Sequence, residues 1–218
     1  MIKYILLILV VIFFSLNMGA SGIAPSFASS YGSGLIKKRN AILLFGFFVI
    51  LGAIILGRNV AVTLGKGLLP REVISFDVVL VILAAATLSL FLANILRIPQ
   101  STSQVTVGAI VGAGLYFRQI NLNMLCFKIL PMWVILPLLS YFLTLLFYRV
   151  IYPPKRNNFH IYEKIFANER KMKISALVVS AYVSFAIGTN NVANAVGPLS
   201  GAGLVSIGTG LLAIAPFF

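Results

Sequence analysis

Long apolar stretches, separated by short polar connections, follow one another along the whole chain. A helix that spans a lipid bilayer needs about 20 mostly apolar residues, and these stretches leave almost no room for a soluble domain. The pattern predicts an all-α, multi-pass integral membrane protein, which we place in the cytoplasmic membrane of the cell. The predicted spans are Tyr4–Leu16 continuing through Gly34, Ala41–Gly57, Val73–Leu96, Thr106–Phe117, Met124–Tyr152 and Ile174–Gly197.

Composition supports the membrane assignment and affects how the net positive charge is interpreted. Hydrophobic residues make up 60% of the chain and charged residues only 10%, and the mean hydropathy is +1.05. A net charge of +13 would indicate nucleic acid as a partner of a soluble protein. Here the basic residues lie in the connections between apolar stretches, so we expect the lipid bilayer, and no nucleic acid, as the partner.

The basic connections predict which parts of the chain face the cytoplasm. Lys37–Arg39 form one cluster, and a second cluster extends from Lys155 to Lys173. By the positive-inside rule both lie inside. If every stretch crosses once, the chain begins outside, residues 58–72 and 118–123 are also outside, and the connection near Arg97 is inside.

An internal repeat appears at an offset of 169 residues, where Ser15–Ala24 aligns with Ser184–Ala193. Five predicted crossings separate the copies, and an odd number inverts the second copy relative to the first. Inverted repeats with broken or re-entrant segments are typical of secondary transporters. The identical pairs are Ser15/Ser184, Gly19/Gly188, Ala24/Ala193, Gly32/Gly201, Gly34/Gly203 and Leu35/Leu204.

The repeat predicts a domain organisation with an incomplete second copy. Residues 1–152 form the first transmembrane repeat, 153–173 a basic cytoplasmic loop, and 174–218 the start of the second, inverted repeat. The second copy ends at the equivalent of Val49. One alternative is therefore an inactive truncated fragment, or a subunit that needs a separately encoded remainder; a homodimer is a further possibility.

Three Gly-, Ser-, Thr- or Asn-rich segments interrupt the apolar pattern: Asn17–Gly34, Pro99–Gly114 and Gly188–Gly203. Non-helical backbone at membrane depth is tolerated where protein or a water-filled cavity surrounds it. Close helix packing through small residues is the rival interpretation. Packing does not require the polar run 100–104 or the run 189–191, which we interpret as functional.

Helix starts within these segments would create a site for an anion. Pro99 presets a helix start that Ser101 or Thr102 can cap, and we expect helix also to restart after Gly22 and after Asn191. Unpaired backbone N–H groups and the positive end of the helix dipole would then face an anion. The predicted substrate-binding residues are Gly19, Ala20, Ser21, Gly22, Ser101, Thr102, Ser103, Gly188, Thr189, Asn190 and Asn191.

Three asparagines are candidates for binding a coupling cation: Asn17, Asn190 and Asn194. Asn190 and Asn194 lie four residues apart and share a helical face, where their amide oxygens could coordinate a cation. The coupling ion is either sodium or a proton, and the sequence does not choose between them. We expect no catalytic residues, no bound metal and no other cofactor.

Two motifs resemble the signatures of the inorganic phosphate transporter (PiT) family, namely Gly188–Pro198 and Ile98–Gly112. The resemblance implies a permease that moves phosphate with sodium ions or protons. The family's signature reads Gly-Ala-Asn-Asp-Val-Ala-Asn where this chain has Gly19–Pro25, and it has Asp where this chain has Asn191. Both signature aspartates are missing from this chain. In that respect the chain is more similar to the family's bacterial sulfate permease branch.

The missing aspartates favour sulfate over phosphate. Phosphate near neutral pH carries a P–OH donor that a carboxylate can accept, whereas sulfate carries none. The four acidic residues, Glu72, Asp77, Glu163 and Glu169, lie in or beside connections. We therefore expect a cation-coupled sulfate permease and not an enzyme, with a phosphate symporter of the same family as the alternative.

Overall fold

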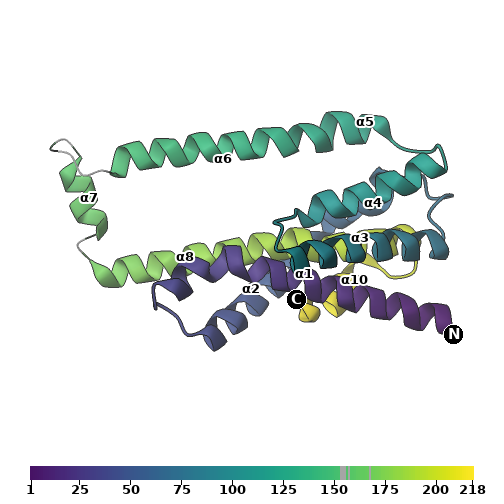
Figure 1. Ribbon diagram of the computed structural model, residues 1–218, viewed down its shortest axis with the longest axis horizontal. Helices are drawn as coiled ribbons and strands as arrows, with labels where there is room; N and C mark the ends of the chain where they lie inside the picture. Colours follow the sequence, from purple (N-terminus) through teal and green to yellow (C-terminus); the bar gives the residue numbers. More distant parts are fainter. Residues whose placement is uncertain (153–155, 157, 167) are drawn as a thin grey trace. The chain divides into compact units, whose positions relative to one another are not determined.

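The structure, a computed structural model, describes residues 1–152, 156, 158–166 and 168–218. Lys155 of the predicted basic cluster lies outside these residues. Helices are the only regular secondary structure in the described part of the chain (Figure 1). They are α1 Ile2–Gly32, α2 Lys38–Val62, η1 Thr63–Gly67, α3 Phe76–Leu96, α4 Thr102–Tyr116, α5 Leu122–Met124, η2 Leu125–Ile129, α6 Leu130–Ile151, α7 Phe159–Phe166, α8 Glu169–Ile187, η3 Gly188–Val192, α9 Ala193–Gly201, α10 Ile207–Ile214 and η4 Ala215–Phe217.

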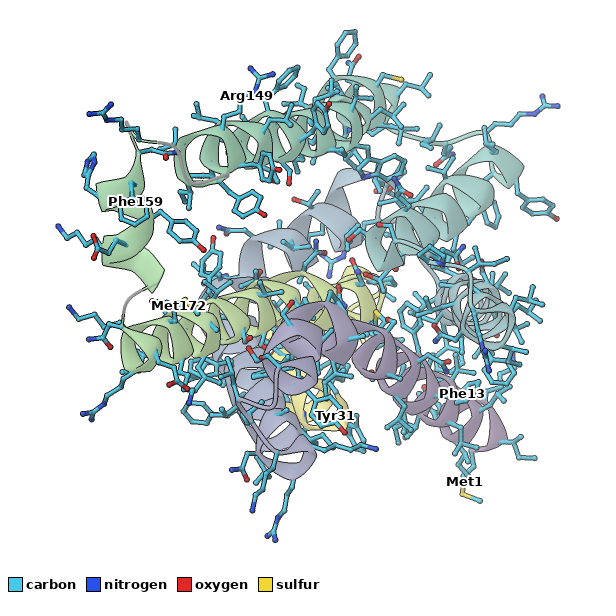
Figure 2. The ribbon with its side chains drawn as sticks, turned by 60° about the vertical axis from the view of Figure 1, so that its left-hand side comes forward. Met1, Phe13, Tyr31, Arg149, Phe159 and Met172 are labelled. Carbon is cyan, nitrogen blue, oxygen red and sulfur yellow. The ribbon has the colours of Figure 1, made fainter. Side chains whose placement is uncertain are left out.

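The chain divides into two compact units. The first contains Met1–Asn121 and Val179–Phe218, and the second contains Leu122–Val178. In the second unit, α6 is apolar along its length, and none of its side chains is buried among the described residues. Figure 2 shows side chains projecting from α6 on several sides, up to Arg149 near its end. Such a surface suits contact with lipid or with other apolar helices.

Among the described residues, five helical segments are long and apolar enough to cross a membrane, which confirms the predicted multi-pass class. They are Ile2–Gly32, Lys38–Gly67, Phe76–Leu96, Leu122–Ile151 and Glu169–Gly201. The sixth predicted span, Thr106–Phe117, falls in α4, which has 15 residues. At 1.5 Å per residue α4 is about 22 Å long, shorter than the roughly 30 Å hydrocarbon core.

Helices α3 and α4 form an antiparallel hairpin, in which the start of α3 lies beside the end of α4. At its open end, Lys3 Nζ is 2.9 Å from Asp77 Oδ1, and Asn121 N–H donates to the Leu68 carbonyl. Its tip lies part-way along the longer helices, since Asn94 near the end of α3 donates to Asn17 in the middle of α1. The bond between Asn121 and Leu68 brings the connections at 58–72 and 118–121 together at the open end. The membrane sides of these connections and of Arg97 stay predictions.

Two of the three expected helix starts are absent, which corrects the predicted origin of the anion site. Helix α1 continues through Gly19–Gly22 without interruption. Helices α8 and α9 are joined through the π-helical segment η3, which occupies Gly188–Val192. The helix start at Thr102 is observed, so α4 alone presents a new N-terminus among these three segments.

The internal repeat is reproduced in backbone detail. Helix α1 ends at Gly32 and α9 at Gly201, and the next helices begin at Lys38 and Ile207, both pairs 169 residues apart. Gly34 and Gly203 share left-handed φ values of 72° and 70°. Three backbone hydrogen bonds also recur at this offset: Ser33 to Ser29 with Ala202 to Pro198, Gly34 to Tyr31 with Gly203 to Ser200, and Leu35 to Ser30 with Leu204 to Leu199.

The two copies run in opposite directions. Ser30 at the end of α1 lies 2.8 Å from Ser180 near the middle of α8, measured between the hydroxyl oxygens. Earlier in α1, Gly22 packs against Ile187, which comes later in α8. Residue numbers therefore rise in opposite directions along the pair, so α1 is antiparallel to the part of α8 that belongs to the first unit. This arrangement is the predicted inverted repeat.

Glycines allow α2 to approach the second copy so closely that the backbones of the two helices are in contact. A Cβ on Gly52 would lie 2.0 Å from the Phe185 carbonyl oxygen, and a Cβ on Gly188 would lie 2.1 Å from that of Val49. Small residues commonly permit such approach between membrane helices. Side chains larger than hydrogen would push α2 away from α8 and η3.

We predict that Gly52→Ala destabilises the protein, because its methyl group meets backbone that cannot move aside. Overpacking of this kind costs about 1–3 kcal/mol. The matched control is Gly46→Ala in the same helix, where a Cβ meets nothing within 4 Å. Thermal melting in detergent, followed by size-exclusion chromatography, should show a lower midpoint for Gly52→Ala only; equal midpoints for both variants would contradict the packing.

Candidate functional site

The tip of the α3–α4 hairpin is built by local sequence. Arg97 adopts a left-handed conformation (φ 57°) and ends α3. Pro99 follows in the non-helical turn, and the Ser101 hydroxyl caps α4 by accepting from Gln104 N–H at 3.4 Å. The Gln100 amide donates to Ser89 at 3.1 Å, which ties the turn back to α3. The N–H groups in the first turn of α4, which have no partner within the helix, therefore lie at the tip, where the end of the helix dipole is positive.

Two hydroxyls at this tip bind amide oxygens of the second copy. Thr102 Oγ1 donates to Asn191 Oδ1 at 2.8 Å, and Ser103 Oγ donates to Asn190 Oδ1 at 2.8 Å. Asn194 Nδ2 lies 3.5 Å from Ser103 Oγ, a longer and weaker contact. The structure therefore brings together residues of two predicted segments that lie almost 90 positions apart in sequence.

The π-helical segment η3 presents these asparagines to the tip. A π segment inside an α-helix shifts the hydrogen-bond register and is frequent at functional sites. Gly188 at its start packs against Val49 of α2, where no side chain fits. Asn190 and Asn191 lie within the segment and Asn194 follows in α9. The sequence contains no signal for the π register beyond the polar run at 189–191.

Asn194 carries an acceptor without a partner. Its side chain is fully buried, and Asn194 Oδ1 has no hydrogen-bond partner in the described part of the chain. An unsatisfied buried polar group costs about 1–3 kcal/mol. As a free acceptor, the atom is chemically able to bind a cation or to accept a hydrogen bond from a ligand.

The electrostatics of the tip are those of a donor-rich site without carboxylates. Asp77 pairs with Lys3 at the open end of the hairpin, and Glu169 pairs with Lys173 at the start of α8. Glu72 and Glu163 complete the acidic residues of the sequence, and neither lies near the tip in sequence. Hydroxyls, amides and the start of α4 are the groups available to a ligand.

The predicted residues of α1 have other contacts. A Cβ on Gly19 would meet the Phe218 carbonyl, and one on Gly22 would meet Phe45 and Ile187. The Ser21 hydroxyl donates to the Met18 carbonyl, and Ala20 is exposed. Gly19 and Gly22 thus pack α1 against its neighbours, and none of the four residues takes part in the Thr102–Asn191 hydrogen bond. Thr189 likewise donates within its own helix, to the Ala186 carbonyl.

Asn17 lies in a second polar contact that includes a residue not predicted from sequence. Asn94 Nδ2 donates to Asn17 Oδ1 at 3.2 Å and to the Asn17 carbonyl at 3.3 Å. Asn17 in turn donates to the Phe13 carbonyl at 2.8 Å. A single asparagine inside the apolar stretch 73–96 was the available signal, because polar side chains within membrane helices need partners.

Comparisons with known sequences find a phosphate transporter family and its sulfate and phosphate permeases. Residues 18–210 match the Phosphate transporter family. The sulfate permease CysP of Bacillus subtilis is 42% identical over 210 residues, covering 94% of this chain and 56% of that permease. A putative phosphate permease of Mycobacterium bovis is 31% identical over 167 residues, covering 68% of this chain and 30% of that protein.

A solved structure supports the fold independently. The structure of a sodium-dependent phosphate transporter matches with a TM-score of 0.71 at 20% identity, covering 100% of this chain and 75% of that one. At this identity the match shows the fold alone. The chain spans 56% and 30% of the two curated relatives described above.

Proposed function

The chain belongs to the phosphate transporter family, and we propose that it carries an inorganic oxyanion across the membrane, with sulfate preferred over phosphate. The observation that carries this proposal is the contact of Thr102 and Ser103 with Asn191 and Asn190, at the start of α4. It concentrates hydrogen-bond donors and a helix N-terminus at one place without a carboxylate. Tetrahedral anions bind at such helix starts.

An anion would replace the bonds that hold the tip against η3. Both hydroxyls now donate to asparagine oxygens at 2.8 Å. An oxyanion accepts from the same hydroxyls and from asparagine N–H₂ groups, and it also meets the free N–H groups at the start of α4. Binding therefore exchanges contacts within the protein for contacts through the ligand, a change suited to alternating access between inverted repeats.

The absence of a carboxylate supports sulfate as the preferred substrate. Phosphate with a P–OH group needs an acceptor as well as donors, whereas sulfate needs donors only. Asn191, where the family signature has aspartate, presents a neutral amide that is 8% exposed. The similarity to a sulfate permease at 42% identity agrees with this preference, and the phosphate permeases among the relatives keep phosphate as the alternative.

Transport of a dianion into a negative-inside cell requires coupling to cations. Moving one charge costs about 2.3 kcal/mol per 100 mV, so a dianion costs about 4.6. Sodium fits the buried, unpartnered Asn194 Oδ1, since it binds neutral oxygens. A coupling proton would need a titratable group, and the hydrogen bonds of the described residues at the Thr102, Ser103 and Asn190 cluster join hydroxyls and amides only.

We predict that cells lacking their own uptake systems, when they express this chain, take up radiolabelled sulfate faster than phosphate. A large excess of unlabelled phosphate should reduce sulfate uptake only weakly. Uptake of phosphate alone would contradict the preference, and uptake of neither anion would contradict the transport proposal. Replacing sodium with choline at constant pH tests the coupling ion in the same assay.

A second prediction concerns the hydroxyls at the tip. Changing Ser101, Thr102 and Ser103 together to Ala removes one helix cap and two donors. A hydrogen bond to a charged group contributes about 1.5–3 kcal/mol, so uptake should fall at least about a hundredfold. Membrane insertion, measured by alkali extraction and immunoblotting, should not change.

The control for this variant is Ser29→Ala with Ser33→Ala, which removes hydroxyls at the end of α1. Ser33 donates to the Ser29 carbonyl, within its own turn. This control should transport normally. Undiminished uptake in the tip variant would remove the three hydroxyls from the site.

A further inference from the structure

A separate basic cavity lies between the ends of α2 and α9 and the start of α10. Its volume is about 600 Å³, within the range of about 300–1,000 Å³ usual for ligand pockets. Arg58 and Lys66 line one side, and Ser200, Gly203 and Ser206 line the other. We name it the α2–α10 cavity.

The cations of this cavity have no acidic partner among the described residues. The ion pairs among the described residues join Lys3 with Asp77 and Lys173 with Glu169. Neither pair includes Arg58 or Lys66. Arg71 adds a third cation at the rim, where its guanidinium would lie 3.8 Å from a Cβ on Gly203. Glu72 is the carboxylate nearest to them in sequence, and it forms no ion pair in the described structure. The cavity is therefore electropositive.

Backbone packing fixes the wall that carries Lys66. The residue lies in the π segment η1, directly after Gly65. A Cβ on Gly65 would lie 2.4 Å from the Gly197 carbonyl oxygen, and one on Gly201 would lie 2.3 Å from the Gly65 carbonyl oxygen. Gly65 is buried in this contact while Lys66 is exposed. The Lys66 side chain thus starts from backbone held against α9.

The cavity is also connected to the proposed transport site through α9. Ser200 lines the cavity, and Asn194 of the tip cluster lies six residues earlier in the same helix. At 1.5 Å per residue this separation is about 9 Å along the helix axis. This separation is slightly longer than the Debye length of about 8 Å at physiological ionic strength, so charges in the cavity act on an anion near the tip most strongly at low salt.

We propose that the α2–α10 cavity is a second oxyanion site, in which Arg58 and Lys66 bind sulfate or phosphate before the anion reaches the tip of the hairpin. This role rests on the proposed transport function. The cavity lies on the face that the charge distribution predicts to be external, where basic residues are disfavoured by the positive-inside rule. A site that collects anions from a dilute medium accounts for unpaired cations there, since such charges raise association rates at low salt.

Lysine protection tests binding in the cavity independently of transport. The 218-residue chain, purified and placed in phosphatidylcholine nanodiscs, is treated with an amine-acetylating reagent in sulfate or in gluconate of equal ionic strength. Mass spectrometry then measures acetylation at each lysine. We expect sulfate to slow acetylation of Lys66 about fivefold or more, and to leave Lys38 unchanged.

The variant Arg58→Gln should abolish the protection of Lys66, because it removes the cation that faces the same cavity. The matched variant Arg39→Gln removes a cation at the other end of α2 and should leave the protection intact. Equal acetylation of Lys66 in sulfate and gluconate would overturn the proposal. So would protection that appears only when phosphatidylglycerol is added, since a lipid headgroup would then occupy the cavity.

Sulfate uptake separates the two proposals. A chain that transports sulfate while Lys66 stays unprotected contradicts the second site alone. A chain that protects Lys66 but transports neither anion contradicts the transport function alone. If both hold, Arg58→Gln with Lys66→Gln should raise the KM for sulfate about five- to tenfold at low ionic strength, and the difference should vanish at high salt.

Discussion

The turn at Arg97–Ser101 interrupts helical hydrogen bonding part-way along the membrane-spanning helices, and its polar groups must find partners within the protein. Unpaired backbone groups in a bilayer cost several kcal/mol each, so such a turn persists only against protein or a water-filled cavity. Ser101 caps the new helix, and Thr102 and Ser103 bind Asn191 and Asn190 of the second copy. The requirement that stabilises the turn therefore also brings together the hydroxyls, amides and helix N-terminus that we propose as a site for an anion.

The second copy reaches this turn because α2 and α8 pack at backbone distance. Gly52 and Gly188 place the carbonyls of Phe185 and Val49 where any Cβ would clash. The approach fixes η3, whose π register carries the asparagines that meet the hairpin. Antiparallel copies then give the proposed site one wall from each repeat, an arrangement that is typical of transporters with inverted repeats.

Sequence reasoning predicted the elements whose signals are local. Apolar length predicted the spanning helices, and the 169-residue offset predicted an inverted repeat, in which the structure gives the paired Gly34 and Gly203 the same left-handed conformation. It failed where tertiary context decides. Gly19–Gly22 lie within the continuous helix α1, where Gly19 and Gly22 allow close contact with Phe218, Phe45 and Ile187, and hydropathy contains no information on such contacts.

The central claim is that the tip of the α3–α4 hairpin lies directly against η3. Replacing Thr102 and Asn191 with cysteine, and Cys126 with serine, gives a chain whose only thiols are at this contact. Mild oxidation should join them within one molecule, so that both thiols become unreactive to maleimide-polyethylene glycol until a reductant is added. Two thiols that remain fully reactive, while a pair at Ser30 and Ser180 is joined under the same conditions, would contradict the account.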